Sequence, residues 1–190
     1  MDLFSPVTVK QSPVVTTPGK NLTGSPRIAR DTVADIHNFI QKWNTYHIEG
    51  IKIVEAMVNL LPRDLKSSND DLLDSSFNLY ILVEKCSEVI EALELFHERI
   101  KALTNLMSEE EILFTTLHLG DMVKHARTIH EAYMKELANK RLVLEHISFV
   151  KSVSEAVFLK CLWKYQTDVN RDVRLALEIL LVETGHRAIT

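Results

Sequence analysis

Apolar side chains recur at alternating spacings of three and four residues from Asp31 onward, which is the period of an amphipathic α-helix. Asp31 is a suitable N-cap for this helix, and Pro62 ends it because proline breaks a helix interior. The stripe consists of Val33, Ile36, Ile40, Trp43, His47, Gly50, Val54, Met57 and Leu61. His47 and Gly50 stand where a large apolar residue would pack better, so the pattern predicts one long helix with a weak middle.

A second stripe keeps this spacing for about five heptads from a start near Asp70 or Asp71. Its members are Leu72, Ser75, Leu79, Leu82, Cys86, Val89, Leu93, Phe96, Ile100, Leu103 and Met107. Four flanking residues widen it: Leu73, Val83, Ile90 and Leu106. A wide stripe is typical of a helix inside a bundle, more than of an isolated two-stranded coiled coil.

The remaining chain carries signals for three more helices. Ser108 followed by Glu111 has the form of a capping box, which predicts a third helical region from that point. Two shorter helices are expected at 153–165 and 170–184, the last one closed by Gly185 as its C′ residue. The long helices, at ~45–55 Å, would overhang this shorter pair. We therefore predict an all-α, elongated helical bundle of long, coiled-coil-like helices with two shorter C-terminal helices.

Proline divides the chain into two regions. Four of the five prolines precede residue 31, among several Ser and Thr residues and few large apolar side chains. Such a segment cannot bury enough apolar surface to offset the entropy lost on ordering. We expect 1–30 to be a disordered tail and 31–190 to be the helical bundle domain.

Short motifs suggest contacts with kinases. Four Ser/Thr–Pro pairs are candidate phosphorylation sites: Ser5, Ser12, Thr17 and Ser25. An extended X–Pro segment can lie in a kinase cleft without unfolding a domain, although unused pairs are also common in such tails. Arg63 and Leu65 have the Arg-x-Leu form of a cyclin-docking motif, a match of only three residues.

Composition narrows the class of protein. The 190 residues are 46% apolar and 25% charged, which suits one folded domain with a tail. No apolar run approaches the ~20 residues of a membrane span, and the N-terminus lacks the pattern of a secretory signal, so we expect a nuclear or cytoplasmic protein. Cys86 and Cys161 are single thiols for which no disulfide is expected. The net charge is −4 and the first thirty residues are basic, so the acidic remainder is a poor match for nucleic acid.

One pair of residues suggests metal chemistry. Glu94 and His97 lie one helical turn apart, as in a di-iron bundle, which needs a second such pair. The other Glu-x-x-His, Glu183 to His186, spans the helix-ending Gly185. The glycines are isolated, so no phosphate-binding loop is expected. We expect neither enzyme activity nor a metal or cofactor; the alternatives are a bundle-type metal-binding or redox protein and a purely structural coiled-coil subunit.

Large aromatic and basic residues are the next candidates for partner contacts. Trp43 and Trp163 fall at stripe positions, where an aromatic residue is either core or an interface anchor. The basic residues of the third helical region are expected on a solvated face: Lys124, Arg127, Lys135, Lys140 and Arg141.

Three blocks of sequence resemble one known family. They are residues 31–43 (DTVADIHNFIQKW), 133–141 (YMKELANKR) and 183–187 (ETGHR), and they are similar to blocks of the cyclin-dependent kinase 2-interacting protein family. The similarity extends from about Asp31 to the end of the chain. Two places depart from the family's pattern: Thr116–Leu117, where a tryptophan is expected, and Thr167, where a proline is expected.

The resemblance implies a nuclear, non-catalytic helical adaptor. It implies as partners a cyclin-dependent kinase with its cyclin, the origin-firing kinase, the ATR checkpoint complex, and AAA-type ATPases together with a second small helical subunit. The processes implied are DNA replication, genome maintenance and ribosome maturation. Within this reading the candidate partner contacts are Trp43, Tyr133, Lys140, Arg141, Trp163, Glu183, His186 and Arg187. For His186 and Arg187 the alternative is a helix end packed against Trp43 or Trp163.

Overall fold

The computed structural model describes residues 22–60 and 69–187, and this part of the chain is all-α, as predicted. Its helices are α1 (Gly24–Leu60), α2 (Asn69–Ala102), α3 (Leu119–His146), α4 (Val153–Lys164) and α5 (Arg171–Glu183). Short 3-10 turns, Leu103–Asn105 and Ile147–Phe149, follow α2 and α3. Among these residues, no helix combines the length and the apolar character that crossing a membrane requires.

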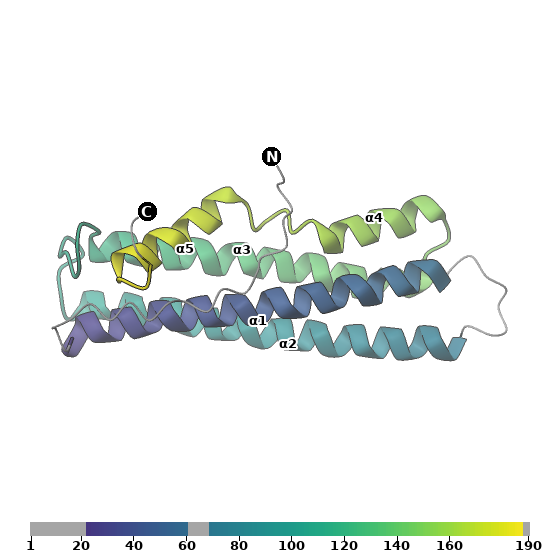
Figure 1. Cartoon of the computed structure of the whole chain (residues 1–190), viewed down its shortest axis with the longest axis horizontal. Helices are drawn as coiled ribbons and strands as arrows, with labels where there is room; N and C mark the ends of the chain where they lie inside the picture. The colour runs from purple at the N-terminus through teal and green to yellow at the C-terminus, as the bar shows by residue number, and fades with distance from the viewer. Residues whose placement is uncertain (1–21, 61–68, 188–190) are drawn as a thin grey trace.

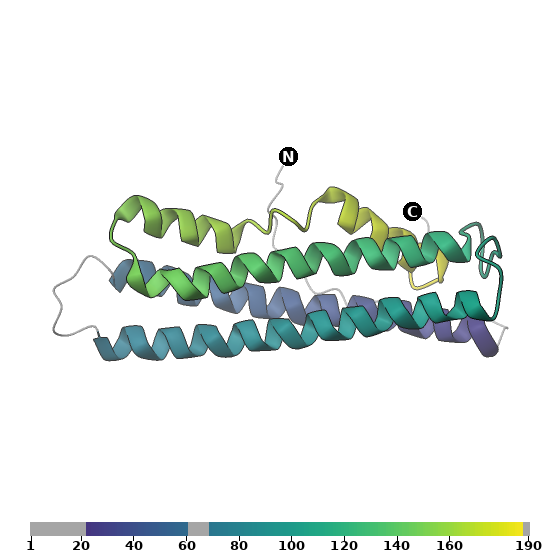
Figure 2. The same ribbon diagram turned by 180° about the vertical axis from the view of Figure 1, so that it is seen from behind.

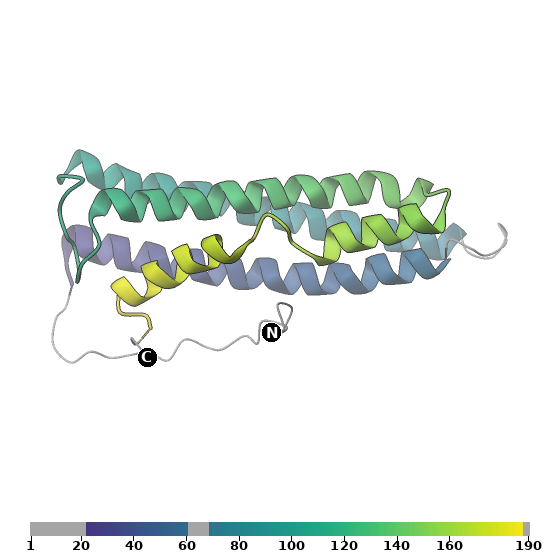
Figure 3. The ribbon, with the colours of Figure 1, turned by 90° about the horizontal axis from the view of Figure 1, so that it is seen from above.

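The helices form an elongated bundle with four columns (Figures 1 and 2). Helix α1 packs on α2, and α2 packs on α3. The fourth column is divided between α4 and α5, which both contact α1 and α3. Figure 3 shows these two short helices following one another along the length of the long ones. The expected overhang is therefore wrong, because the short pair stacks end to end instead of side by side.

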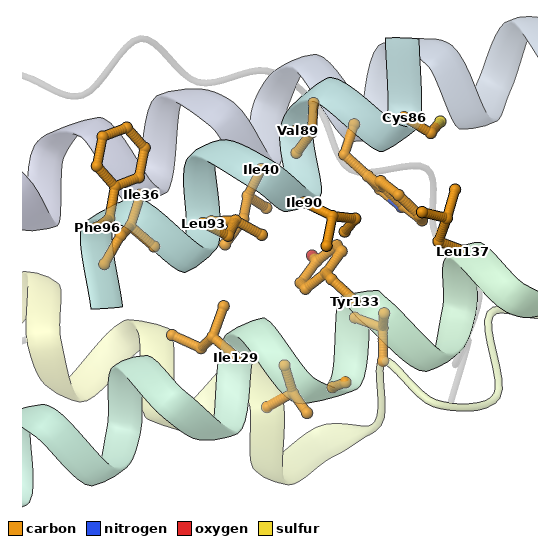
Figure 4. Close-up of a cluster of buried hydrophobic side chains, with 14 of the residues drawn as sticks. Ile36, Ile40, Cys86, Val89, Ile90, Leu93, Phe96, Ile129, Tyr133 and Leu137 are labelled. Carbon is orange, nitrogen blue, oxygen red and sulfur yellow. The ribbon is translucent and has the colours of Figure 1, made fainter. Parts of the chain in front are cut away.

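The predicted stripes form the core. Every member of the first stripe from Val33 to Met57 is buried, including His47 and Gly50. In the second stripe the flanking residues Val83 and Ile90 are buried as well, whereas the other two expected flanking residues, Leu73 and Leu106, are 69% and 75% exposed. Figure 4 shows side chains of α1, α2 and α3 meeting between the helices, including Ile36, Ile40, Val89, Ile90, Leu93, Phe96, Ile129, Tyr133 and Leu137.

Helix α1 begins at Gly24, seven residues before the expected N-cap Asp31. Gly24 has a φ of +67°, which glycine adopts readily, and Pro26 lies in the first turn, where its missing N–H costs nothing. Ala29 is completely buried, so these additional residues of α1 contribute to the core. Residues 24–30 of the expected tail are therefore helical, and residues 1–21 lie outside the described part.

The predicted helix start at Ser108 is wrong. The Ser108 hydroxyl accepts a hydrogen bond from the Glu110 N–H (3.3 Å), but only a turn forms, and α3 begins at Leu119. The physical reason is that the N–H groups of residues 115–117 bind the carboxylate of Glu183, so they do not enter a helix.

The boundaries of α4 and α5 are confirmed, and their caps explain them. Ser152 caps α4 by accepting from the Glu155 N–H (3.2 Å), and Asn170 caps α5 by accepting from two backbone N–H groups. Gly185, with φ +75°, occupies the C′ position, and its N–H and that of His186 bind carbonyls of the last turn, as in a Schellman motif.

Candidate functional site

The break between α4 and α5 lies against a cluster of buried polar side chains. The Trp43 indole N–H donates to Oε1 of Gln166 (2.6 Å), and the Asn139 amide donates to Oδ2 of Asp168 (2.9 Å). Both acceptors belong to the six-residue link between the two short helices. The link is therefore tied to α1 and to α3 through specific hydrogen bonds at the middle of the bundle.

Lys140 lies at the centre of this cluster and is completely buried. Its Nζ lies 3.1 Å from Nδ1 of His47, 4.4 Å from the ring centroid of Trp163 and 5.4 Å from that of Trp43. An ammonium can only donate, so His47 Nδ1 accepts and its imidazole is neutral. Burial, with the Lys140 charge adding to it, lowers the pKa of His47 to about 3. Two indole faces and one imidazole thus replace the water around this cation.

Glu136 is the counter-charge of Lys140, one helical turn away on α3. Its Oε1 lies 3.6 Å from Lys140 Nζ, and both side chains are 0% exposed. Burial raises the pKa of Glu136 and lowers the pKa of Lys140 to about 8, and in each case the partner's charge opposes the shift. Both oxygens of Glu136 lack a hydrogen bond of good geometry among the described residues, although Asn139 and the backbone of Asp168 favour the charged carboxylate.

The ion pair lies beside the break between the two short helices. Lys140 lies over Trp163 in the last turn of α4, and Glu136 lies beside Asp168, just ahead of the N-cap of α5. A cation at a helix C-terminus and an anion at a helix N-terminus are both favourable. If α3 were shifted along its axis by one turn, Lys140 would lose Trp163 and Glu136 would lose Asp168 while both charges stayed buried. The pair therefore favours the observed register of α3 against α4 and α5.

Gly50 explains the weak middle of the first stripe. A Cβ atom at this position would lie 2.1 Å from Cζ2 of Trp163, so the indole occupies the space that any other residue would fill. The Trp163 N–H then donates to the carbonyl oxygen of His47 (3.2 Å). Gly50 therefore leaves the space for the Trp163 ring, and His47 supplies acceptors for both the Trp163 N–H and Lys140.

Cys86 and Tyr133 border this centre as buried, uncharged groups. Burial raises the pKa of the Cys86 thiol to about 12, so it is not a ready nucleophile, and burial likewise raises the pKa of Tyr133. The Tyr133 ring packs edge-on against Trp43, with 5.2 Å between centroids. Both cysteines are free thiols, and Cys161 is half-buried.

The C-terminal block holds two distant segments in place. Oε1 of Glu183 accepts hydrogen bonds from the N–H groups of Thr115, Thr116 and Leu117 at 2.8, 2.5 and 2.8 Å. Burial alone would raise the pKa of Glu183, but these hydrogen bonds outweigh it and hold the pKa below its usual range. The bonds use backbone atoms, so they do not depend on a tryptophan at 116 or 117.

The last described residues pack against α1 rather than against a tryptophan. His186 Nε2 lies 3.0 Å from the carbonyl oxygen of Arg30, and Arg187 pairs with Glu178. Neither Trp43 nor Trp163 is the neighbour that the alternative for this block suggested.

The structure separates the eight candidate contact residues into two groups. Five lie inside the bundle: Trp43, Tyr133, Lys140, Trp163 and Glu183. The core alternative therefore describes both tryptophans, and the assignment of Lys140 to a solvated face is wrong. Arg141, His186 and Arg187 reach the surface, where Arg141 donates to the Ser87 hydroxyl (2.9 Å).

The other candidate motifs are placed as follows. Ser25 is the second residue of α1, whereas Ser5, Ser12 and Thr17 lie outside the described residues, as do Arg63 and Leu65. Glu94 is exposed, and the His97 ring stacks on that of His130 with 6.4 Å between centroids. Within residues 22–60 and 69–187, no three metal-ligating side chains come together.

Sequence reasoning missed Glu136, Asn139, Gln166 and Asp168. One signal for the centre was present, because Lys140 lies three residues after Leu137 and four before Leu144, at the spacing of an apolar helix stripe. A charged residue at an apolar-stripe position, with an opposite charge one turn earlier, indicates an ion pair buried in the bundle. Here the polar link between α4 and α5 packs beside that pair.

Several large apolar side chains are exposed, and two groups of them lie close together in the sequence or on one helix. The first, which we call the end face, comprises Leu73, Phe77 and Tyr80 of α2 and Phe149 after α3. The second is on α4 and comprises Val153, Val157 and Phe158. Contiguous exposed apolar patches are one feature of surfaces that contact other proteins.

The fold is a helical bundle with a buried ion pair and with groups of apolar side chains on its surface, features found in helical proteins that bind other proteins. Known proteins extend this assignment. The chain is 31% identical over 197 residues to the human protein named cyclin-dependent kinase 2-interacting protein, covering 88% of this chain and 93% of that one. The proteins of that name from Xenopus laevis and Mus musculus are 27% and 25% identical over 205 residues, covering 94% and 92% of this chain and 99% and 97% of their own lengths. No family model matches the chain. The chain belongs to the cyclin-dependent kinase 2-interacting protein family, which confirms the resemblance seen in the three sequence blocks.

Proposed function

We propose that this chain is a non-catalytic adaptor that binds cyclin-dependent kinase 2. The observation that carries the proposal is the similarity, over nearly the whole chain, to proteins named for interacting with that kinase. The exposed apolar side chains of α2 and α4 support it, because an adaptor needs contact surfaces that its own core does not use.

The direct test is binding of the purified full-length chain to purified cyclin-dependent kinase 2, with and without its cyclin, by isothermal titration calorimetry. We expect saturable binding. A folded chain that binds neither form of the kinase would refute the proposal.

The family resemblance supports a wider set of partners for the same adaptor. These are the origin-firing kinase, the ATR checkpoint complex, and AAA-type ATPases with a second small helical subunit, met in the nucleus during DNA replication, genome maintenance and ribosome maturation. The test is affinity purification of the tagged chain from nuclear extract with quantitative mass spectrometry. The paired variants His186→Ala and Arg187→Ala examine the C-terminal block, because a truncation before Glu183 would also release residues 115–117. Absence of all these partners would leave only the kinase assignment.

The kinase can also act on this chain as a substrate. Ser25 lies in the first turn of α1 and is half-buried, so the Ser25–Pro26 bond is not presented in an extended segment. We expect Ser25 to be phosphorylated more slowly than Ser5, Ser12 or Thr17 in a purified kinase reaction mapped by mass spectrometry. Equal labelling of all four sites would contradict this expectation.

A further inference from the structure

The first turns of α2 carry two apolar stripes instead of one. The inner stripe, which includes Leu79, is buried in the core. Leu73, Phe77 and Tyr80 lie on a different stripe, at the i, i+4 and i+7 spacing that places side chains on one side of a helix. Their exposed fractions are 69%, 61% and 48%. The described part of the bundle leaves this second stripe uncovered.

The end of α3 extends this apolar surface. The Ser76 and Ser148 hydroxyls are hydrogen bonded at 2.9 Å, which fixes the first turns of α2 against the 3-10 turn after α3. Figure 2 shows the start of α2 alongside the end of α3. Phe149, the residue after Ser148, is 78% exposed. Three of the four residues in the end face are thus aromatic, and aromatic residues are enriched in protein interfaces.

Carboxylates outnumber cations around the end face. Arg141 and Lys151 are the exposed cations nearby, against five exposed carboxylates on α2 and α3: Asp70, Asp71, Asp74, Glu84 and Glu145. Asp70 and Asp71 lie in the first turn of α2, where they also stabilise the helix dipole. Asp74, Glu84 and Glu145 lie outside the first turn of α2, so the helix dipole does not explain them. None of the five forms an ion pair with another described residue.

We propose that the end face binds an amphipathic helix of a partner protein, one whose apolar stripe is flanked by Lys and Arg. This inference rests on the proposed adaptor function and assigns it a surface and a partner chemistry. The charges select the occupant: a second copy of this chain would present the same acidic surface, and an anionic membrane or a nucleic acid would be repelled. A basic amphipathic helix satisfies both the aromatic stripe and its carboxylates.

The probe is a fluorescein-labelled synthetic peptide of about 20 residues, with Leu and Ile on one helical face and Lys and Arg beside them. A matched peptide has Glu in place of every Lys and Arg. Fluorescence anisotropy with the full-length chain should show saturable binding of the basic peptide that weakens with added salt. The acidic peptide should bind at least about tenfold more weakly, the effect of ~1.4 kcal/mol in binding free energy.

Two pairs of variants locate the site on the chain. Leu73→Ser with Phe77→Ser should weaken binding of the basic peptide by about tenfold or more, whereas Leu95→Ser, at a 66% exposed position on the same helix, should leave it unchanged. Asp74→Lys with Glu84→Lys should also weaken binding, whereas Glu94→Lys should not. All substituted positions are exposed, so circular dichroism and thermal unfolding should match those of the unaltered chain.

Three results would overturn the proposal. One is equal binding of the basic and acidic peptides. Another is equal loss of binding with Leu95→Ser and with the Leu73/Phe77 double variant. The third is a dimer of the unaltered chain, seen by sedimentation, that Phe77→Ser converts to a monomer. Calorimetry with cyclin-dependent kinase 2 on the same samples separates this inference from the adaptor function, because kinase binding can be present while the end face fails every peptide test.

Discussion

Replacing Gly50 with alanine should destabilise the bundle, although helix propensity alone predicts the opposite sign. An alanine in place of glycine inside a helix normally stabilises by about 0.5–1 kcal/mol. Here the new Cβ would lie 2.1 Å from Trp163 Cζ2 and 2.5 Å from Cε2. The indole is completely buried, so it cannot move aside without displacing its neighbours.

The size of the effect follows from the contacts that the indole must give up. Overpacking a core costs about 1–3 kcal/mol. Moving Trp163 also breaks its hydrogen bond to the His47 carbonyl, worth about 1 kcal/mol, and weakens its contact with Lys140 at 4.4 Å. After the propensity gain is subtracted, we expect a net loss of about 2–4 kcal/mol. For a domain of this size that lowers Tm by roughly 4–16 °C, at about 2–4 °C per kcal/mol.

The assay is urea unfolding followed by far-UV circular dichroism, with the stability of Gly50→Ala compared with that of Ala56→Gly. Ala56 is an exposed residue of the same helix, so its substitution reports helix propensity alone and should cost about 1 kcal/mol. In a Trp163→Phe background, where the ring is smaller, Gly50→Ala should become neutral or stabilising. A Gly50→Ala protein as stable as the unaltered chain would refute the conclusion that the Trp163 ring needs the space left by Gly50.

Three further predictions concern buried titratable groups. Lys140→Met should lower the free energy of unfolding by about 3–5 kcal/mol, measured in urea, because it leaves the buried Glu136 carboxylate without a counter-charge. Adding Glu136→Leu should recover most of this loss. A Lys140→Met protein as stable as the unaltered chain would contradict the buried ion pair. His47 has its pKa lowered to about 3 in the folded chain, so its contribution to stability is complete above pH ~6.5 and is lost as the pH falls from 6.5 towards 3. The stability of the unaltered chain should therefore fall more steeply than that of His47→Gln over that window, and parallel curves would show that His47 is not buried as a neutral group. Glu183→Gln should speed hydrogen exchange of the amides of 115–117 and lower the free energy of unfolding by about 1.5–3 kcal/mol, the range for hydrogen bonds to a charged group. Unchanged exchange would show that the hydrogen bonds from Glu183 do not stabilise this segment.

The helices were predictable because their signals are local. The stripe from Val33 to Met57, the cap at Asn170 and the C′ glycine at 185 each depend on residues within a few positions of one another. The capping-box pattern at Ser108 failed for a non-local reason. A carboxylate 75 residues later, on Glu183, binds the amides that a helix there would have needed.

The candidate site was only partly visible in the sequence. The polar residues His47 and Gly50 at stripe positions marked its place, but nothing near them indicated Lys140 or Trp163. These contacts span 93 and 116 residues of sequence. The end face could not be recognised in the sequence either, because the spacing of Leu73 and Phe77 would be the same if these residues were buried at the flank of the core.

Taken by itself, the sequence determined the all-α class, the apolar stripes and the ends of the C-terminal helices, because periodicity and capping act over one or two helical turns. Tertiary structure alone decided that α4 and α5 stack end to end, that Lys140 and Glu136 are buried at their break, and that Leu73, Phe77 and Phe149 remain outside. These outcomes depend on which helices become neighbours, and that choice is made by shape and charge complementarity between residues far apart in the chain.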